Sequence, residues 1–129
     1  FFGKQLREAI TEVGIDSTGL LSDPEIHTTL AMVHTYPDGD RDFSFYRNPG
    51  ADMMLKEDEI PTELIKNSKI FHFGTLSMTH DGVRAATKKA ISIAEEANAL
   101  ISFDPNLRPP LWKTMQKNRL HMVCPSVTF

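Results

Sequence analysis

The chain has 129 residues, of which 40% are hydrophobic and 24% are charged, and its formal net charge at pH 7 is −3. The length is typical of one domain, and the composition excludes the apolar-poor, highly charged signature of disordered chains. The acidic balance argues against a nucleic acid or an anionic membrane as a partner, because both require a basic surface.

Cysteine and apolar content narrow the class of protein further. The single cysteine, Cys124, can form no internal disulfide and has no Cys/His set at zinc-ligand spacing near it, so we predict an incidental thiol. The longest apolar stretches are far below the ~20 residues that span a bilayer, and no signal segment opens the chain. We therefore expect a cytoplasmic protein. Because the chain begins without a Met, directly inside a helical pattern, we expect the true N-terminus to lie elsewhere.

An amphipathic helix is the first predicted element. Apolar residues at positions 2–13 fall on one stripe with charged residues between them, and Gly14 is a suitable left-handed residue after the helix end. Further along, the segment 48–52 reads as a loop, and Pro61 suits the first position of a short helix that runs to about Asn67.

A β-hairpin is predicted between these helices. Residues 28–36 and 41–47 are rich in β-branched and aromatic side chains, and the Pro-Asp-Gly-Asp segment 37–40 between them is typical of a turn. Because side chains alternate along a strand, Phe45 and Arg47 share one face of the second arm. Two strands alone are marginally stable, so one face of the hairpin should pack on another element.

The second half of the chain predicts a strand-helix-strand unit. Residues 69–77 read as a buried strand, 81–97 as a long helix with an alanine-rich stripe, and 99–103 as the next strand. Asn98 is a tolerable left-handed residue between the helix and the last strand. A crossover of this kind joins parallel strands.

The loop after the last strand carries the residues best suited to chemistry. Ligands of open α/β sheets bind beyond the carboxyl ends of the strands, and here Asp104, Asn106 and Arg108 alternate in a proline-stiffened loop. A guanidinium can pair with a phosphate through two hydrogen bonds, and the other two side chains can bind hydroxyls or metal-bound water. The alternative is local: Asp104 caps the following turn and Arg108 pairs with a neighbour.

The sequence Phe-Asp-Pro-Asn-Leu-Arg-Pro-Pro-Leu-Trp at 103–112 resembles the mid-chain signature of fructokinases in the PfkB (ribokinase-like) family, most of all the bacterial ones. Three further segments agree in order and spacing: 40–52 is similar to the lid arm, 71–77 to a sheet strand, and Phe2-Gly3 to the end of a Gly-Asp-Asp-x-Phe-Gly segment. The chain is therefore identified as a central fragment of a carbohydrate kinase.

The resemblance implies an α/β fold: a partial Rossmann-like, ribokinase-type domain built on the parallel strand-helix-strand unit, with a small β-hairpin lid. Residues 1–26 and 48–115 would form the partial kinase core, and 27–47 the lid. Residues 116–129 show no resemblance. Back-translation read two bases later gives fructokinase-like sequence, so we predict a frameshift near 113–116 and a tail without evolved function.

The resemblance also implies substrate contacts, at Phe45, Arg47, Gly74, Asn106 and Arg108. Phe45 would lie against the sugar, Arg47 would bind sugar oxygens or an anionic group, and Gly74 would allow close backbone approach. The nucleotide phosphates and magnesium would lie near Asp104, Asn106 and Arg108. The plain structural alternatives are lid core for Phe45, a surface charge for Arg47 and packing for Gly74.

For the intact enzyme the resemblance implies transfer of the γ-phosphate of ATP to fructose, with Mg²⁺ and K⁺ as candidate cations and a homodimer formed through the lid. No metal ligand is assigned within this chain. The base for the sugar hydroxyl and the anion hole would follow this chain, and the early sugar-binding segment would precede it, so we expect no turnover by the fragment alone. Alternatives are a PfkB kinase for another sugar or a nucleoside, and a non-catalytic sugar-binding or dimerisation module.

Overall fold

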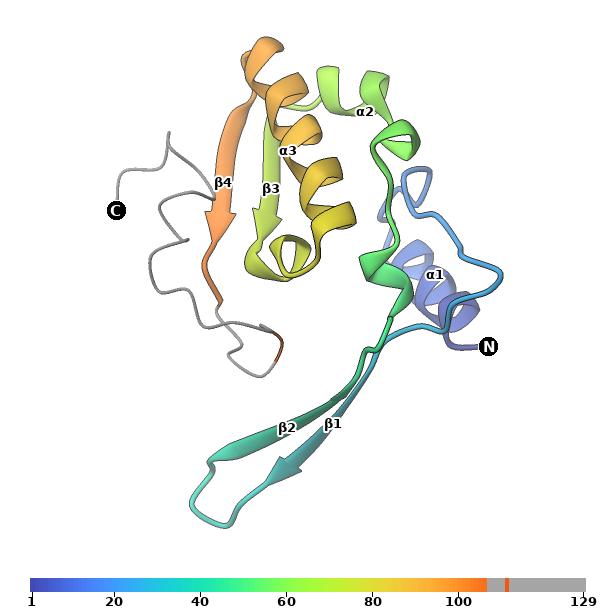
Figure 1. The fold of residues 1–129 in the computed structure, drawn as a ribbon, viewed down its shortest axis with the longest axis vertical. Helices are drawn as coiled ribbons and strands as arrows, with labels where there is room; N and C mark the ends of the chain where they lie inside the picture. The colour runs from blue at the N-terminus through green and yellow to red at the C-terminus, as the bar shows by residue number, and fades with distance from the viewer. Residues whose placement is uncertain (107–110, 112–129) are drawn as a thin grey trace. The chain divides into compact units, whose positions relative to one another are not determined.

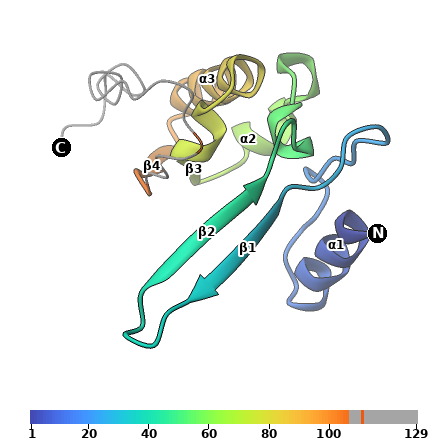
Figure 2. The same ribbon diagram turned by 60° about the horizontal axis from the view of Figure 1, so that its bottom comes forward.

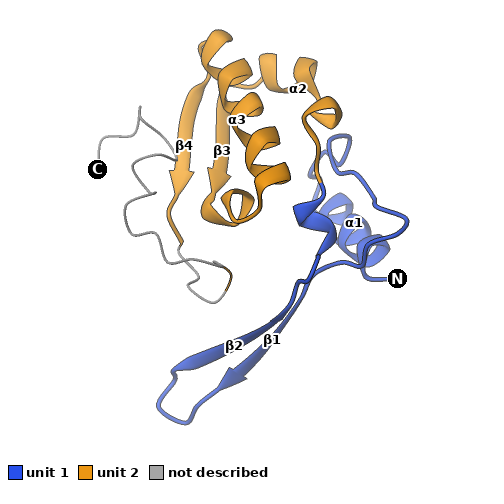
Figure 3. Ribbon diagram, viewed as in Figure 1, with its two compact units in different colours: residues 1–54 blue, residues 55–129 orange. Residues whose placement is uncertain are grey.

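The computed structural model describes residues 1–106 and residue 111 (Figure 1). The chain divides into two compact units, which are residues 1–54 (unit 1) and residues 55–129 (unit 2) (Figure 3). Unit 1 contains an α-helix, an antiparallel hairpin and a short 3-10 helix, and unit 2 contains a parallel pair of strands with helices. The expected α/β class is confirmed.

Unit 1 begins with helix α1 (Phe2–Glu12), as the apolar stripe predicted. Gly14 follows with φ +78°, the left-handed conformation expected of a residue after a helix end. None of the residues of α1 is fully buried, although Ile10 is half-buried. Arg7 ties the helix to the loop after it: its Nη1 donates to the Ser17 carbonyl at 3.2 Å, and its Nη2 donates to the Leu20 carbonyl.

The predicted hairpin is formed by β1 (Leu30–Thr35) and β2 (Arg41–Tyr46), which run side by side up to the turn (Figure 2). The strands pair antiparallel, from Leu30 opposite Tyr46 to Thr35 opposite Arg41. Gly39 supplies the left-handed residue of the turn, with φ +88°. Every residue of β1 is exposed, whereas Phe43 and Phe45 of β2 are half-buried and stack with their ring centroids 6.0 Å apart.

Unit 2 contains the predicted strand-helix-strand unit. Strand β3 (Ile70–Gly74) and strand β4 (Leu100–Asp104) pair in parallel, from Ile70 opposite Leu100 to Gly74 opposite Asp104, and helix α3 (Asp81–Glu96) connects them. The short helix α2 (Thr62–Lys66) precedes β3, one residue after the predicted Pro61 start. Asn98 has φ 56°, so its predicted left-handed conformation is confirmed.

The first strand of this unit is shorter than predicted. It ends at Gly74, and Thr75–Met78 form the 3-10 helix η3 in place of the expected strand to Ser77. The hydroxyl of Ser77 donates to the Gly74 carbonyl at 2.9 Å. Such local side-chain-to-backbone hydrogen bonds compete with the strand ladder, and alternation of apolar residues alone does not reveal them.

The core of unit 2 lies between α3 and its neighbours. One buried cluster consists of Phe73, Met78 and Ile91, and a second consists of Ile65, Ala90 and Ala94. The alanines let the helix approach closely, as the predicted stripe required. Ile91 was not on that stripe, yet it is buried, in the cluster with Phe73 of β3 and Met78 of η3. This packing fixes the ends of β3 and β4, where candidate site residues lie.

Candidate functional site

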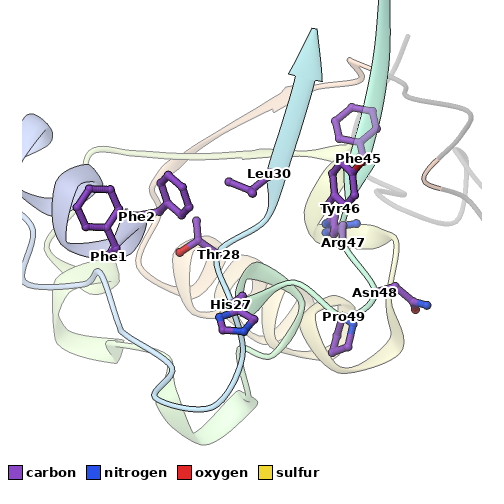
Figure 4. A pocket seen from close by; sticks show the side chains of 10 residues that line it. All are labelled: Phe1, Phe2, His27, Thr28, Leu30, Phe45, Tyr46, Arg47, Asn48 and Pro49. Atoms are coloured by element: carbon purple, nitrogen blue, oxygen red, sulfur yellow. The ribbon is translucent and has the colours of Figure 1, made fainter.

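A pocket of about 530 Å³ lies at the base of the hairpin, within unit 1 (Figure 4). Its volume is in the range of small-molecule sites. The lining combines apolar and polar side chains, which are Phe1, Phe2, His27, Thr28, Leu30, Phe45, Tyr46, Arg47, Asn48 and Pro49. Figure 4 shows the two phenylalanines of the N-terminal segment on one side and residues 45–49 on the other. Among these lining residues, Arg47 is the one Lys or Arg, and there is no Asp or Glu.

The Arg47 side chain is held by a carboxylate behind the pocket. Its Nε lies 2.7 Å and its Nη2 2.6 Å from the same oxygen, Oδ2 of Asp52. The other oxygen of Asp52, Oδ1, accepts a hydrogen bond from the Thr29 hydroxyl. Only 5% of the Arg47 side chain is exposed, against 45% for Asp52. The guanidinium is therefore fixed by charge-assisted hydrogen bonds, so it is a preorganised donor rather than a mobile surface charge.

A glycine makes room for this cluster. Gly50 is buried, and a Cβ at its position would lie 1.9 Å from Thr29 Oγ1, 2.7 Å from Asp52 Oδ1 and 3.0 Å from Arg47 Cγ. Its φ of −105° is open to any residue, so steric contact and not backbone conformation requires glycine here. The amide of the next residue, Ala51, donates to the His27 carbonyl at 2.9 Å. The segment before β1 and the loop after β2 are thus joined.

A second group of candidate residues meets at the carboxyl ends of β3 and β4 in unit 2. Gly74 lies opposite Asp104, and a Cβ on Gly74 would be 3.5 Å from the Asp104 carbonyl oxygen. Oδ1 of Asp104 accepts a hydrogen bond from the backbone amide nitrogen of Asn106 at 3.0 Å. This is the local turn contact that the sequence left open as an alternative. The hydroxyl of Thr75, which is 1% exposed, donates to the Asn106 carbonyl at 3.1 Å. The Asn106 backbone is thus held by Asp104 at the end of β4 and by Thr75, the residue after β3.

The structure brings Phe45 and Arg47 together in the pocket, and it brings Gly74, Asp104 and Asn106 together at one sheet end. The prediction for Arg108 lies outside the described residues, as do those for Cys124 and for the tail 116–129. Sequence reasoning missed Asp52, Thr29 and Thr75 as parts of these sites. Asp52 had one usable signal: an opposite charge five residues after Arg47, across a Pro-Gly loop.

The described residues hold no ready metal centre. No group of three or more His, Cys, Asp or Glu side chains within the described ranges could hold a metal ion. No described helix is long and apolar enough to cross a membrane. The carboxyl group of Asp16, which is not among the pocket-lining residues, departs clearly from its ordinary acidity. The side-chain hydroxyl and then the amide of Thr18 lower the pKa of Asp16, and burial opposes them slightly.

The parallel strand-helix-strand unit and the antiparallel hairpin agree with the α/β fold that the sequence motifs predicted. Residues 1–129 match the model of the pfkB family carbohydrate kinases, and the chain belongs to this family. The family predicted from the motifs is confirmed, together with its α/β fold.

Fructokinases are prominent among the similar proteins. The chain is 43% identical over 122 residues to probable fructokinase-3 of Arabidopsis thaliana, covering 95% of this chain and 35% of that protein. A fructokinase from Xylella fastidiosa, solved with bound ATP, matches with a TM-score of 0.82 and 31% identity over 93% of this chain and 37% of that one. A double mutant of the Vibrio cholerae fructokinase, solved with fructose, ADP and potassium ion, matches with a TM-score of 0.76 and 27% identity over 94% and 38% of the two chains. The chain thus spans little more than a third of the length of these proteins.

Proposed function

We propose that this chain is the central segment of an ATP-dependent fructokinase that converts fructose to fructose 6-phosphate. The observation that carries the proposal is the agreement of sequence and fold: 43% identity to a plant fructokinase and a TM-score of 0.82 to a bacterial one, each over more than nine-tenths of this chain. The pocket at the hairpin base suits a polyhydroxylated ligand, since it combines aromatic side chains with a fixed guanidinium.

In the proposed reaction, the 6-hydroxyl oxygen of fructose attacks the γ-phosphorus of ATP. The bond from that phosphorus to the oxygen bridging to the β-phosphate breaks, and ADP leaves. The hydroxyl proton passes to an aspartate base that the sequence resemblance places beyond this chain. Catalysis of this kind depends almost wholly on positioning and electrostatic stabilisation, so the role of this segment is to position the reactants.

The two clusters would divide that task. Phe45 would pack against the sugar, Arg47 would donate to its oxygens, and Gly74 would leave space for the substrate. Asp104 and Asn106, together with Arg108, would lie near the transferred phosphoryl group.

Mg²⁺ would enter with the ATP phosphates. The Asp104 carboxylate would lie in the vicinity of this ion, and one of its oxygens already accepts a hydrogen bond from the Asn106 amide. K⁺ is a further candidate cation, since the Vibrio protein was solved with potassium.

We also propose that residues 27–47 act as a lid on a core formed by 1–26 and 48–115, and that the lid contacts a second copy of the protein. Exposed apolar side chains on the hairpin support this homodimer: Met32 is 60% exposed, Val33 53% and Tyr46 68%. A cytoplasmic location is part of the same proposal. Light scattering of the complete protein should give twice the monomer mass, and Val33→Lys should return it to the monomer mass.

The test of function compares two polypeptides in a coupled assay for ADP. The complete kinase that carries this segment should consume ATP in the presence of fructose, whereas the purified 129-residue chain should show no fructose-dependent rate. Turnover by the short chain would contradict the assignment of the base to another segment. Fructose binding by the complete protein without turnover would favour the second candidate, a non-catalytic sugar-binding module that uses the fixed guanidinium of Arg47 in the pocket.

A further inference from the structure

Asp52 shapes the pocket without lining it. The pocket residues include Arg47 but not Asp52, although the two side chains are joined by two contacts of 2.7 and 2.6 Å. Both contacts end on the single oxygen Oδ2, on the Nε and Nη2 edge of the guanidinium. A ligand that reaches Arg47 from the pocket therefore meets a guanidinium whose one edge is already committed to a carboxylate.

The position of Asp52 is itself fixed. Thr29, the last residue before β1, donates its hydroxyl to Oδ1, and Gly50 leaves no spare volume beside that oxygen. Asp52 belongs to the 3-10 helix η1 (Ala51–Met53), while Arg47 directly follows β2. The carboxylate thus connects both ends of the hairpin, and it cannot turn away from Arg47 without losing the Thr29 hydrogen bond.

The ion pair also sets the charge that a ligand experiences. A lone, largely buried arginine attracts carboxylates and phosphates strongly, because two parallel hydrogen bonds add to the Coulomb attraction. Here Asp52 lies at ion-pair distance and cancels most of that attraction, so an anionic ligand would compete with a carboxylate that is already in place. A neutral hydroxyl has no net charge, so it loses much less from this cancellation than an anion does.

We infer that Asp52 is a specificity-determining and positioning residue: it holds Arg47 as a donor for sugar hydroxyls and makes the pocket discriminate against anionic sugars. This inference rests on the proposed function. It resolves the choice that the sequence left open for Arg47, between sugar oxygens and an anionic group, in favour of the oxygens. In this inference Asp52 determines the specificity of the pocket through Arg47, without itself touching the ligand.

The test uses Asp52→Asn in the complete kinase, because asparagine keeps the size of the side chain and removes its charge. Two probes are compared: D-fructose, which is neutral, and 2-keto-D-gluconate, a six-carbon keto acid, measured as a competitive inhibitor. In the variant the ratio of the inhibition constant for the acid to the KM for fructose should fall about tenfold or more, the order expected from removing one charge near a partly buried cation. The matched control is Asp42→Asn on β2, where the same charge is lost from an exposed side chain, and the ratio should stay at the wild-type value.

Two further variants separate position from charge. Thr29→Val frees one oxygen of Asp52 without changing any charge, so the KM for fructose should rise about threefold to tenfold while the preference between the probes stays unchanged. Asp52→Glu keeps the charge and should keep the discrimination against the acid. If Asp52→Asn proves unfolded by circular dichroism, these two variants still decide: an unchanged fructose KM in Thr29→Val, or a loss of discrimination in Asp52→Glu, overturns the inference.

The outcomes also separate this inference from the proposed function. A wild-type protein that neither binds nor phosphorylates fructose would refute the proposed function. A wild-type protein that phosphorylates fructose, with a probe ratio that is the same in Asp52→Asn, would leave the proposed function standing and refute the role of Asp52.

Discussion

Replacement of Gly50 by alanine is expected to loosen the base of the hairpin, and the size of the effect follows from three contacts. A Cβ at this position would lie 1.9 Å from Thr29 Oγ1, so that oxygen would have to move by about 1 Å to reach the shortest distances that real Cβ atoms show. The movement breaks the hydrogen bond from Thr29 to the Asp52 carboxylate. Hydrogen bonds to charged groups contribute roughly 1.5–3 kcal/mol, and because Asp52 is 45% exposed the lower part of that range applies. With the second contact, 2.7 Å from Asp52 Oδ1, we expect a loss of about 2 kcal/mol.

Amide hydrogen exchange measures this loss where it occurs. The Ala51 amide donates to the His27 carbonyl at 2.9 Å, so its exchange reports the opening of the hairpin base. A loss of about 2 kcal/mol corresponds to roughly 30-fold faster exchange in Gly50→Ala. Removing the Thr29 oxygen removes the worst contact, so Thr29→Ala combined with Gly50→Ala should accelerate exchange by less than the product of the two single effects.

Gly39→Ala is the matched control for this experiment. Gly39 has φ +88°, and no atom lies within 4 Å of the place that an added methyl group would take, so alanine there strains the turn but clashes with no neighbour. Exchange of the Ala51 amide should remain at the wild-type rate in this variant. The steric argument is refuted if Gly50→Ala leaves Ala51 exchange unchanged, or if the effects of Thr29→Ala and Gly50→Ala multiply independently.

Three further predictions concern the rest of the chain. Met78→Ala should lower the free energy of unfolding by about 2–5 kcal/mol in a urea titration, because Met78 is fully buried; a change below about 0.5 kcal/mol, the size typical of surface substitutions, would contradict this. Thr18→Val should raise the pKa of Asp16 toward its ordinary value, as followed by NMR titration of the carboxyl group, and an unchanged titration would refute the assigned cause. Because the pKa of Asp16 is lowered in the folded state, its contribution to stability is present above the ordinary value of 3.8 and is lost as the pH falls through the folded-state pKa. Asn98→Val should cost about 1–2 kcal/mol, since φ is 56°, while Asn98→Gly should be tolerated; equal stability of the two variants would contradict the backbone argument.

The secondary structure of this protein was largely readable from the sequence. The apolar stripe of α1, the turn residues between β1 and β2, and the alternation of strand, alanine-rich helix and strand each predict an element that the structure contains. These signals are local, because periodicity and turn chemistry act within a few residues. The family was also evident at this level, since the motif at 103–112 and the lid-arm segment at 40–52 carry the resemblance on their own.

Local sequence signals failed to predict the structure where contacts with residues far along the chain determine it. Residues 75–77 have a strand-like pattern, yet they form η3, which is held by the local Ser77 hydrogen bond to the Gly74 carbonyl and by a Thr75 hydrogen bond to the carbonyl of Asn106, 31 residues away. Ile91 lies off the predicted stripe, yet it is buried together with Phe73 of β3 and Met78 of η3. Such contacts depend on where β4 and its loop lie, and no window of sequence contains that information.

The candidate site likewise has features that the sequence predicted and features that only the tertiary structure shows. Alternation along β2 already placed Phe45 and Arg47 on one face, and the end of a parallel strand already pointed to Asp104 and Asn106. Only the tertiary structure decided what surrounds Arg47: Asp52 reaches it across a loop, and Thr29 reaches Asp52 from 23 residues away, because the hairpin brings its two ends together. The sequence determined which residue types the site contains, and the folded chain determined their charge balance and geometry, since both depend on distances between residues that are far apart along the chain.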